Sequence, residues 1–205
     1  MRWIGLTGGI ASGKSTVSRI LRERGFPVVD ADQLARLAVQ SGTPGFNEVV
    51  RVFGPDVVGS DGELDRKKIG QLVFSDPSLL AKLEAIVHPR VRELAQAERK
   101  RLSDEGHEAA FYDVPLLFEK KMQNMFDRVI AVVCEPAVQI ERLKTRDGLT
   151  QEEAERRLSA QIPIEEKAKL ADEVIRNDGT LEDLKKSVDE VLKRLGISPV
   201  HQAQT

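Results

Sequence analysis

Short apolar runs alternate along the chain with longer stretches in which apolar residues recur every three or four positions. The short runs are rich in Val, Ile, Phe or Tyr and predict strands covered on both faces, whereas the longer spacing predicts amphipathic helices. Strands are expected near residues 2–7, 27–30, 109–113, 128–133 and 173–176. Helices are expected near residues 14–24, 31–40, 45–53, 65–74, 77–87, 89–104, 136–146, 151–161, 164–171 and 181–195. This alternation indicates an α/β fold with a mostly parallel sheet.

Several of the predicted helix ends carry capping residues. Thr150 followed by Glu153 has the spacing of a capping box, and Pro136 suits the first position of a helix. Gly25 and Gly196 follow helical runs, where a left-handed residue commonly ends a helix.

Two stretches are longer than a single crossover helix requires. About 80 residues without a convincing strand separate the second and third strands. They predict a helical insertion, about 45–105, over the carboxyl edge of the sheet, where α/β proteins bind ligands. A strongly charged helical stretch, about 142–165, predicts a lid. We therefore expect one domain over 1–200 that contains both, followed by a polar tail at 197–205.

The composition is that of a water-soluble globular protein. The chain has 205 residues, of which 40% are hydrophobic and 31% charged, with a formal net charge of -2. This charge does not call for nucleic acid as a partner, and no apolar run approaches the roughly 18 residues that span a bilayer. Cys134 is the single cysteine and lies in an apolar run, so we expect a core residue in a cytoplasmic protein. The oligomeric state stays open.

The segment Gly8–Ser15 fits the phosphate-binding pattern G-x-x-x-x-G-K-[ST] between a predicted strand and a predicted helix. In this context backbone N–H groups and the positive end of the helix face an anion, whereas a glycine-rich turn before an ordinary helix is the alternative. Lys14 is expected to reach the β- and γ-phosphates of a nucleoside triphosphate, and the Ser15 hydroxyl to bind Mg²⁺. The nucleotide-binding residues expected here are Gly9, Ile10, Ala11, Ser12, Gly13, Lys14, Ser15 and Thr16.

Carboxylates follow two of the predicted strands. Asp30 and Asp32 end the second strand, beside the phosphate-binding loop in a parallel sheet. Asp32 is the candidate that accepts a hydroxyl proton in phosphoryl transfer, and Asp30 is well placed to cap the next helix. Asp113 ends the third strand and either holds Mg²⁺, directly or through water, or caps the turn that follows.

Basic residues suggest further contacts with the substrates. Arg142 and Arg146 lie four positions apart on one helix face, where lid arginines close over a transferring phosphate; a merely solvated helix is the alternative. His88 precedes Pro89, which suits the start of a helix, so His88 is either a cap residue or a ligand contact.

The ordered set of motifs resembles the dephospho-CoA kinase family. The resemblance runs from about Ile4 to Leu195 and rests on the phosphate-binding loop and the segments that follow it. These segments are Asp30-Ala31-Asp32, His88-Pro89, Val114-Pro115-Leu116-Leu117-Phe118-Glu119, Arg142-Leu143, Arg146-Asp147, Gln161, Lys167, Ala171-Asp172 and Asn177.

The resemblance implies ATP-dependent phosphorylation of the ribose 3′-hydroxyl of dephospho-CoA. It also implies a three-layer α/β/α P-loop kinase fold with a five-stranded parallel sheet, a helical substrate-binding subdomain and a helical lid. Asp32 would be the catalytic carboxylate, and Lys14 with Arg142 or Arg146 would stabilise the transferring phosphoryl group. Asn177 would lie by the adenine of ATP. The acceptor-side residues would be Asp32, His88, Arg90 and Leu116.

Three other interpretations stay open on the residues alone. A P-loop kinase could act on another small acceptor, and an ATP-binding regulatory protein could lack turnover. A GTPase switch is a third alternative, because Asp56-Val57-Val58-Gly59 fits D-x-x-G, but no N-K-x-D string is present to read guanine.

Overall fold

The computed structural model describes residues 1–198 of the chain, and these residues form two compact units. The first unit contains residues 1–29 and the chain after Lys100, and the second contains residues 30–100. No helix within the described residues is long and apolar enough to span a bilayer.

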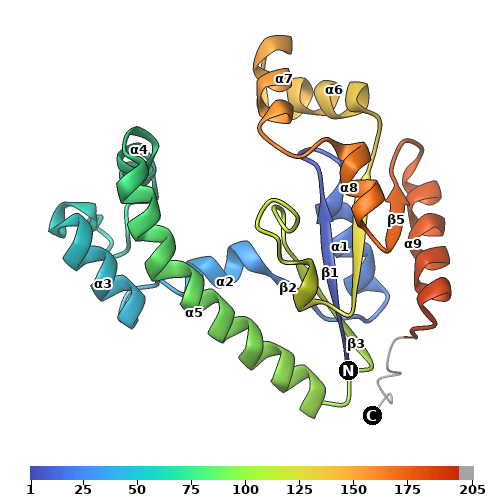
Figure 1. The fold of residues 1–205 in the computed structure, drawn as a ribbon, viewed down its shortest axis with the longest axis horizontal. Coiled ribbons are helices and arrows are strands. Elements are labelled where there is room, and N and C mark those ends of the chain that lie inside the picture. The colour runs from blue at the N-terminus through green and yellow to red at the C-terminus, as the bar shows by residue number, and fades with distance from the viewer. Residues whose placement is uncertain (199–205) are drawn as a thin grey trace. The chain divides into compact units, whose positions relative to one another are not determined.

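The first unit is built on a five-stranded sheet (Figure 1). The strands are β1 (Arg2–Gly8), β2 (Val28–Asp30), β3 (Ala109–Asp113), β4 (Arg128–Val133) and β5 (Glu173–Arg176), in the order β2-β3-β1-β4-β5. The β1 strand lies in the centre and pairs in parallel with β3 and β4, and β4 pairs in parallel with β5. The five strands predicted from the apolar runs are confirmed.

Helices cover both faces of this sheet, and the alternation of side chains along β4 shows which helix lies on which face. Ile130 and Val132 pack in a core with α1 (Lys14–Glu23) and α9 (Leu181–Leu195), whereas Ala131 and Val133 pack with Ile164 of α8 (Ile164–Leu170). Successive residues of a strand point to opposite faces, so α8 lies across the sheet from α1 and α9. This is the predicted three-layer α/β/α architecture.

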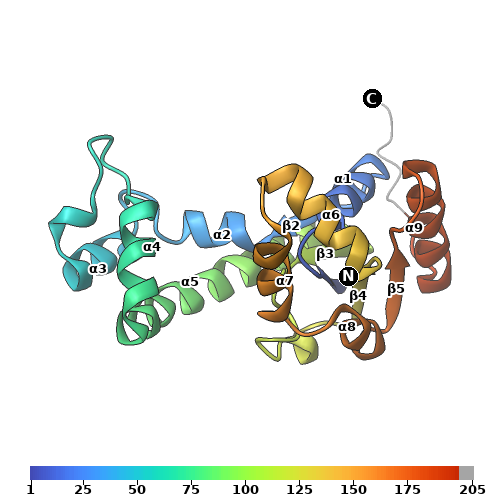
Figure 2. The same cartoon turned by 90° about the horizontal axis from the view of Figure 1, so that it is seen from above.

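The predicted lid segment, about 142–165, covers the end of α6 (Pro136–Asp147) and all of α7 (Gln151–Ser159), which follow β4 and precede α8 in the first unit (Figure 2). The Thr150–Glu153 capping box at the start of α7 and the position of Pro136 at the start of α6 are as predicted. A one-turn 3₁₀ helix, η2 (Gln123–Met125), precedes β4.

The second unit is helical and has its own apolar core. Its elements are α2 (Ala31–Leu37), α3 (Pro44–Phe53), η1 (Pro55–Val57), α4 (Arg66–Ser75) and most of α5 (Pro77–Asp104). Val49, Val57, Ile69 and Ile86 form the centre of this core. The predicted bounds of the insertion, 45–105, stay a prediction beside the observed unit of residues 30–100.

The prediction of two helices at 77–87 and 89–104 is wrong, because α5 runs without interruption through Pro89. Proline lacks the N–H that would bond to the carbonyl of Ala85, which normally breaks or bends a helix. Next to this missing backbone bond, the Arg90 guanidinium donates to the Ile86 carbonyl at 2.6 Å. The helix is thus held on both sides of Pro89 by the burial of Ile86 and by this side-chain bond.

The end of the chain differs in part from the expected polar tail. Gly25 and Gly196 have positive φ, as predicted. Ile197, which was assigned to the tail, is buried in the core with α1 and α9, and its N–H donates to the Leu192 carbonyl at 3.2 Å. Residues 199–205 of the predicted tail lie outside the described residues.

Candidate active site

The phosphate-binding loop joins the carboxyl end of β1 to the first turn of α1. Gly13 has φ of +95° and Ala11 has φ of +57°, so the chain turns twice through the left-handed region within three residues. The Ser12 N–H donates to the Gly9 carbonyl at 3.1 Å and closes the turn. The first N–H groups of a helix have no partner within it, so α1 presents donors and its positive dipole end where an anion would bind.

Lys14 is held by the carboxylate at the end of β3. Its ammonium forms an ion pair with Asp113, whose other carboxylate oxygen accepts from Ser18 Oγ at 2.6 Å. Asp113 is only 4% exposed. Of the two roles considered for Asp113, capping of the following turn is not seen among the described residues. Its carboxylate instead orients the lysine that is expected to reach the phosphates.

Arg142 and Asn177 donate hydrogen bonds to backbone carbonyls of the same loop. Arg142 Nη1 donates to the carbonyls of Ala11 and Ser12 at 3.3 and 3.4 Å, and Nη2 donates to the Asn177 carbonyl at 3.0 Å. The Asn177 amide, which is buried, donates to the Ser12 carbonyl at 2.7 Å. Two residues predicted from distant parts of the sequence therefore meet at the loop.

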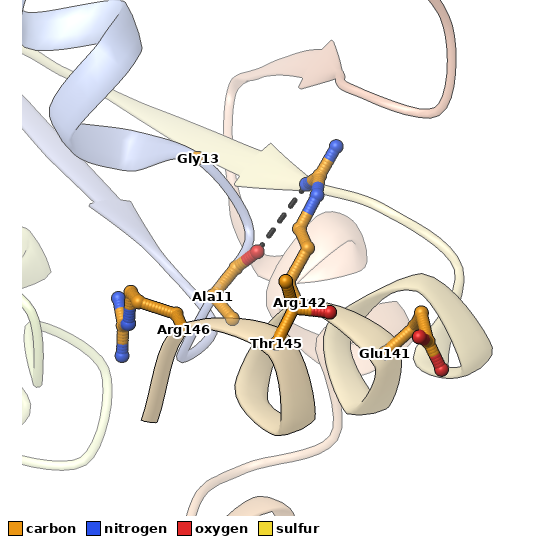
Figure 3. A pocket seen from close by; sticks show the side chains of 6 residues that line it. All are labelled: Ala11, Gly13, Glu141, Arg142, Thr145 and Arg146. Atoms are coloured by element: carbon orange, nitrogen blue, oxygen red, sulfur yellow. Dashed lines mark hydrogen bonds between the residues drawn. The ribbon is translucent and has the colours of Figure 1, made fainter. Parts of the chain in front are cut away.

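A cavity of about 360 Å³ opens beside this contact (Figure 3). Figure 3 shows Arg142 directed toward the Ala11 carbonyl, while Arg146 extends from the next turn of α6 in another direction. Arg146 is bound to Asp147 through two hydrogen bonds of 2.7 and 3.0 Å, and these raise the pKa of Arg146 and lower that of Asp147. The lining residues are Ala11, Gly13, Glu141, Arg142, Thr145 and Arg146.

Asp30 and Asp32 have different environments in the second unit. Asp30 is the N-cap of α2, since its carboxylate accepts from the N–H groups of Asp32 and Gln33 at 2.8 and 3.1 Å. Asp32 is exposed, and among the described residues its carboxylate has no hydrogen bond or ion pair. The expected capping role of Asp30 is confirmed, and the Asp32 carboxylate is available for a ligand.

The other acceptor-side candidates are spread over both units. His88 lies inside α5 rather than at a helix start, with Nε2 3.9 Å from Glu84 Oε1, so its cap-region alternative is wrong. Arg90 forms an ion pair of 2.7 Å with Glu48. Leu116 follows β3 in the first unit and is 38% exposed.

Cys134 is buried at the end of β4. Burial raises the pKa of its thiol to about 11, although the nearby Arg142 charge opposes this shift. A protonated, buried thiol is a poor nucleophile, in agreement with the core role expected from the sequence.

A buried charge that no sequence motif had indicated as functional lies beneath the loop. Lys167 has no exposed surface, and its ammonium lies 2.7 Å from Glu119 Oε1 and 3.5 Å from the Gly8 carbonyl. Ile162 N–H donates to the same Glu119 oxygen at 3.2 Å. The helix α8 is largely charged, so the sequence carries no signal that sets Lys167 apart, and only the fold shows that it lies under the loop.

Gln139 and Gln161 also contact the loop, although the sequence had indicated no role for either residue. Gln139 Nε2 donates to the Ile10 carbonyl at 2.6 Å, and the Ile10 N–H donates to Gln161 Oε1 at 3.0 Å. Gln139 carried no recognisable pattern, and Gln161 entered only through the family resemblance. Neither contact follows from spacing along the chain.

The donor set at the loop suits magnesium completed by substrate and water. The Ser15 hydroxyl and the Asp113 carboxylate are hard oxygen donors, which Mg²⁺ prefers. Within residues 1–198, no three His, Cys, Asp or Glu side chains gather as a protein-only metal site. Mg²⁺ commonly keeps waters and binds substrate phosphates together with one or two protein ligands, so the residues fit this ion.

The parallel sheet, the loop between β1 and α1, and the lysine at the start of α1 together define a P-loop kinase. The family model described as dephospho-CoA kinase matches residues 2–183. The chain belongs to the dephospho-CoA kinase family, whose reaction is the last step of coenzyme A synthesis.

Individual relatives agree with this assignment over most of the chain. A dephospho-CoA kinase of Anaeromyxobacter dehalogenans is 52% identical over 195 residues, which cover 95% of this chain and 92% of the relative. A solved structure from Thermus thermophilus is 42% identical, with a TM-score of 0.81 and coverage of 95% and 97% of the two chains. A solved dephospho-CoA kinase from Campylobacter jejuni is 29% identical, with a TM-score of 0.72 and coverage of 94% and 96%.

Proposed function

We propose that this protein transfers the γ-phosphoryl group of ATP to the ribose 3′-hydroxyl of dephospho-CoA, giving coenzyme A and ADP. The observation that carries the proposal is the loop at residues 8–15, with Lys14 held against Asp113, in a chain of the dephospho-CoA kinase family. The cytoplasm is the location we propose, because a chain with a single cysteine forms no internal disulfide.

The phosphate side of the reaction is assigned to the loop and to α6. The loop backbone and Thr16 bind the phosphates, and Lys14 stabilises the charge that develops on the transferring group. The Arg146 side chain is 61% exposed, so it can leave Asp147 and bind the γ-phosphate instead. Arg142 holds the loop carbonyls and, with Asn177, borders the position proposed for the adenine.

The acceptor side is assigned to Asp32, His88, Arg90 and Leu116. Asp32 orients the 3′-hydroxyl and accepts its proton as the oxygen attacks the γ-phosphorus in line. Its availability supports this role, since a carboxylate already engaged in a cap or an ion pair would have to break that contact first. His88, Arg90 and Leu116 contact the remainder of the acceptor.

Magnesium is assigned to Ser15, with Asp113 as a neighbour that acts directly or through water. When bound, it neutralises charge on the β- and γ-phosphates. The lid segment excludes water, which would otherwise compete with the 3′-hydroxyl for the phosphoryl group.

The test is ATP consumption by the purified protein with Mg²⁺, with and without dephospho-CoA, and identification of the product by mass. We expect strong stimulation and a product heavier by one phosphoryl group. Turnover on a nucleoside or a sugar acid, without stimulation by dephospho-CoA, would retain the kinase chemistry and refute the acceptor. Binding of ATP without turnover on any acceptor would instead favour a regulatory protein.

A further inference from the structure

Two glutamine side chains bind the two backbone polar groups of Ile10. Gln139, on α6, donates from Nε2 to the Ile10 carbonyl at 2.6 Å, and Gln161, between α7 and α8, accepts from the Ile10 N–H at 3.0 Å. Gln139 is only 3% exposed. Both backbone polar groups of Ile10 are therefore bound by residues more than a hundred positions away in the sequence.

The orientation of both amides follows from their partners. A backbone carbonyl can only accept and a backbone N–H can only donate, so Gln139 must present its nitrogen and Gln161 its oxygen. The two glutamines are therefore not equivalent, since one acts as a donor and the other as an acceptor.

The carbonyl held by Gln139 determines the direction of the next amide. A trans peptide is planar, so the Ala11 N–H points away from the side on which the Ile10 carbonyl lies. Other loop carbonyls are also bound by side-chain donors, Gly8 by Lys167 and Ser12 by Asn177. With the carbonyl oxygens engaged in this way, rotation of a loop peptide that would bring an oxygen toward a phosphate loses a hydrogen bond.

We propose that Gln139 and Gln161 are positioning residues for ATP. Gln139 fixes the peptide between Ile10 and Ala11 and so directs the Ala11 N–H toward the phosphates. Gln161 fixes the preceding peptide, between Gly9 and Ile10, by accepting from the Ile10 N–H. The inference rests on the proposed use of the loop for nucleotide binding, but it does not depend on the identity of the phosphoryl acceptor.

The test uses four single variants and reads nucleotide affinity directly. Gln139→Met and Gln161→Met keep nearly the same volume and remove one hydrogen bond each. Gln161→Glu retains an acceptor for the Ile10 N–H, whereas Gln139→Glu places a carboxylate oxygen against the Ile10 carbonyl. Both acidic variants add the same charge beside the same residue; they differ in the direction of the hydrogen bond that they allow and in burial, since Gln139 is the more buried of the two.

For each variant, we would measure the Kd for ADP with Mg²⁺ by calorimetry and the KM for ATP. Each methionine variant should weaken ADP binding by about five- to tenfold, the effect of one hydrogen bond. Gln161→Glu should stay within about fivefold of the wild type, and Gln139→Glu should lose more than about 50-fold because its buried carboxylate is unpaired. The KM for dephospho-CoA should change by less than about twofold.

Thermal unfolding of each variant separates positioning from loss of fold, and Gln151→Met is the matched control. Gln151 lies on α7 and bonds only to the exposed Glu155 at 2.7 Å among the described residues, so its variant should bind ADP normally. Folded methionine variants with wild-type ADP affinity would overturn the proposal. Equal losses in Gln139→Glu and Gln161→Glu would also overturn it, because the direction of the bonds would then not matter. If dephospho-CoA failed as an acceptor, these ADP measurements would still decide the role of the glutamines.

Discussion

Replacing Gly13 by alanine would set a methyl group against the amide of Asn177. The new Cβ would collide with Asn177 Nδ2 and would lie 3.2 Å from Asn177 Cγ. Asn177 could avoid the methyl group only by withdrawing from the Ser12 carbonyl, to which it donates at 2.7 Å. The substitution therefore strains the backbone and breaks a buried contact at the same time.

The two effects can be separated in magnitude. An alanine at φ of +95° costs about 1–2 kcal/mol because the left-handed region is unfavourable for residues with a Cβ. Loss of the bond from Asn177 adds about 1–1.5 kcal/mol. Gly106 is the matched control in the same unit, because its φ is +83° and nothing would meet its Cβ within 4 Å. Gly106→Ala should show only the backbone cost.

Fluorescence of Trp3 offers a selective assay of the first unit. Trp3 is the single tryptophan, lies in β1 and is 3% exposed, so its emission should change when the sheet unfolds. Gly13→Ala should lower the Tm by about 2–6 °C more than Gly106→Ala does, the shift expected for a difference of about 1–1.5 kcal/mol. Equal Tm values for the two variants would refute the steric part of this reasoning.

Three further predictions concern catalysis and the cysteine. Lys14→Ala should reduce turnover by at least about 100-fold with far-UV circular dichroism unchanged; wild-type rates would contradict the role of the loop. Asp32→Asn should lower kcat by about 100-fold with little effect on ATP binding, whereas Asp30→Asn, which can still cap α2, should stay near wild type; a change in ATP affinity alone would contradict the acceptor-side role. The Cys134 thiol, with its pKa raised by burial from 9.0 to about 11, should resist a thiol reagent at pH 8 until the chain is unfolded. Because the pKa of Cys134 is higher in the folded state than in the unfolded state, the thiol favours the folded state fully below about pH 9, and this preference is lost as the pH rises to about 11. The free energy of unfolding, measured with urea at both pH values, should therefore decrease by less in Cys134→Ala than in the wild type.

The sheet and the loop could be predicted from sequence because their signals are local. Apolar runs marked all five strands, and the glycine and lysine spacing marked the loop with its flanking strand and helix. The helix break expected at Pro89 is absent because packing overrides the local rule: Ile86 is buried in the core of the second unit, and the Arg90 side chain donates to its carbonyl.

The supporting contacts of the site could not be predicted because they depend on distant parts of the chain. Asp113 was expected near the metal or in a cap, yet it holds Lys14, which lies 99 positions away. Gln139 reaches Ile10 across 129 positions, and no residue pattern near either one encodes that meeting. The residue types indicated which chemical groups were available, but only the fold shows which of these groups contact one another.

The interruption of the first unit by the second has a consequence for protein synthesis. The β1 strand is made first, but its partners follow the second unit in the chain, with Arg2 opposite Ala109 and Ile4 opposite Arg128. Residues 30–100 are all translated before either partner strand exists. At about 5–20 residues per second, roughly 4–15 seconds pass between the end of the second unit and the end of β5. The helical insertion can thus complete its folding on the ribosome while the first strand and the loop that follows it wait for the rest of their sheet.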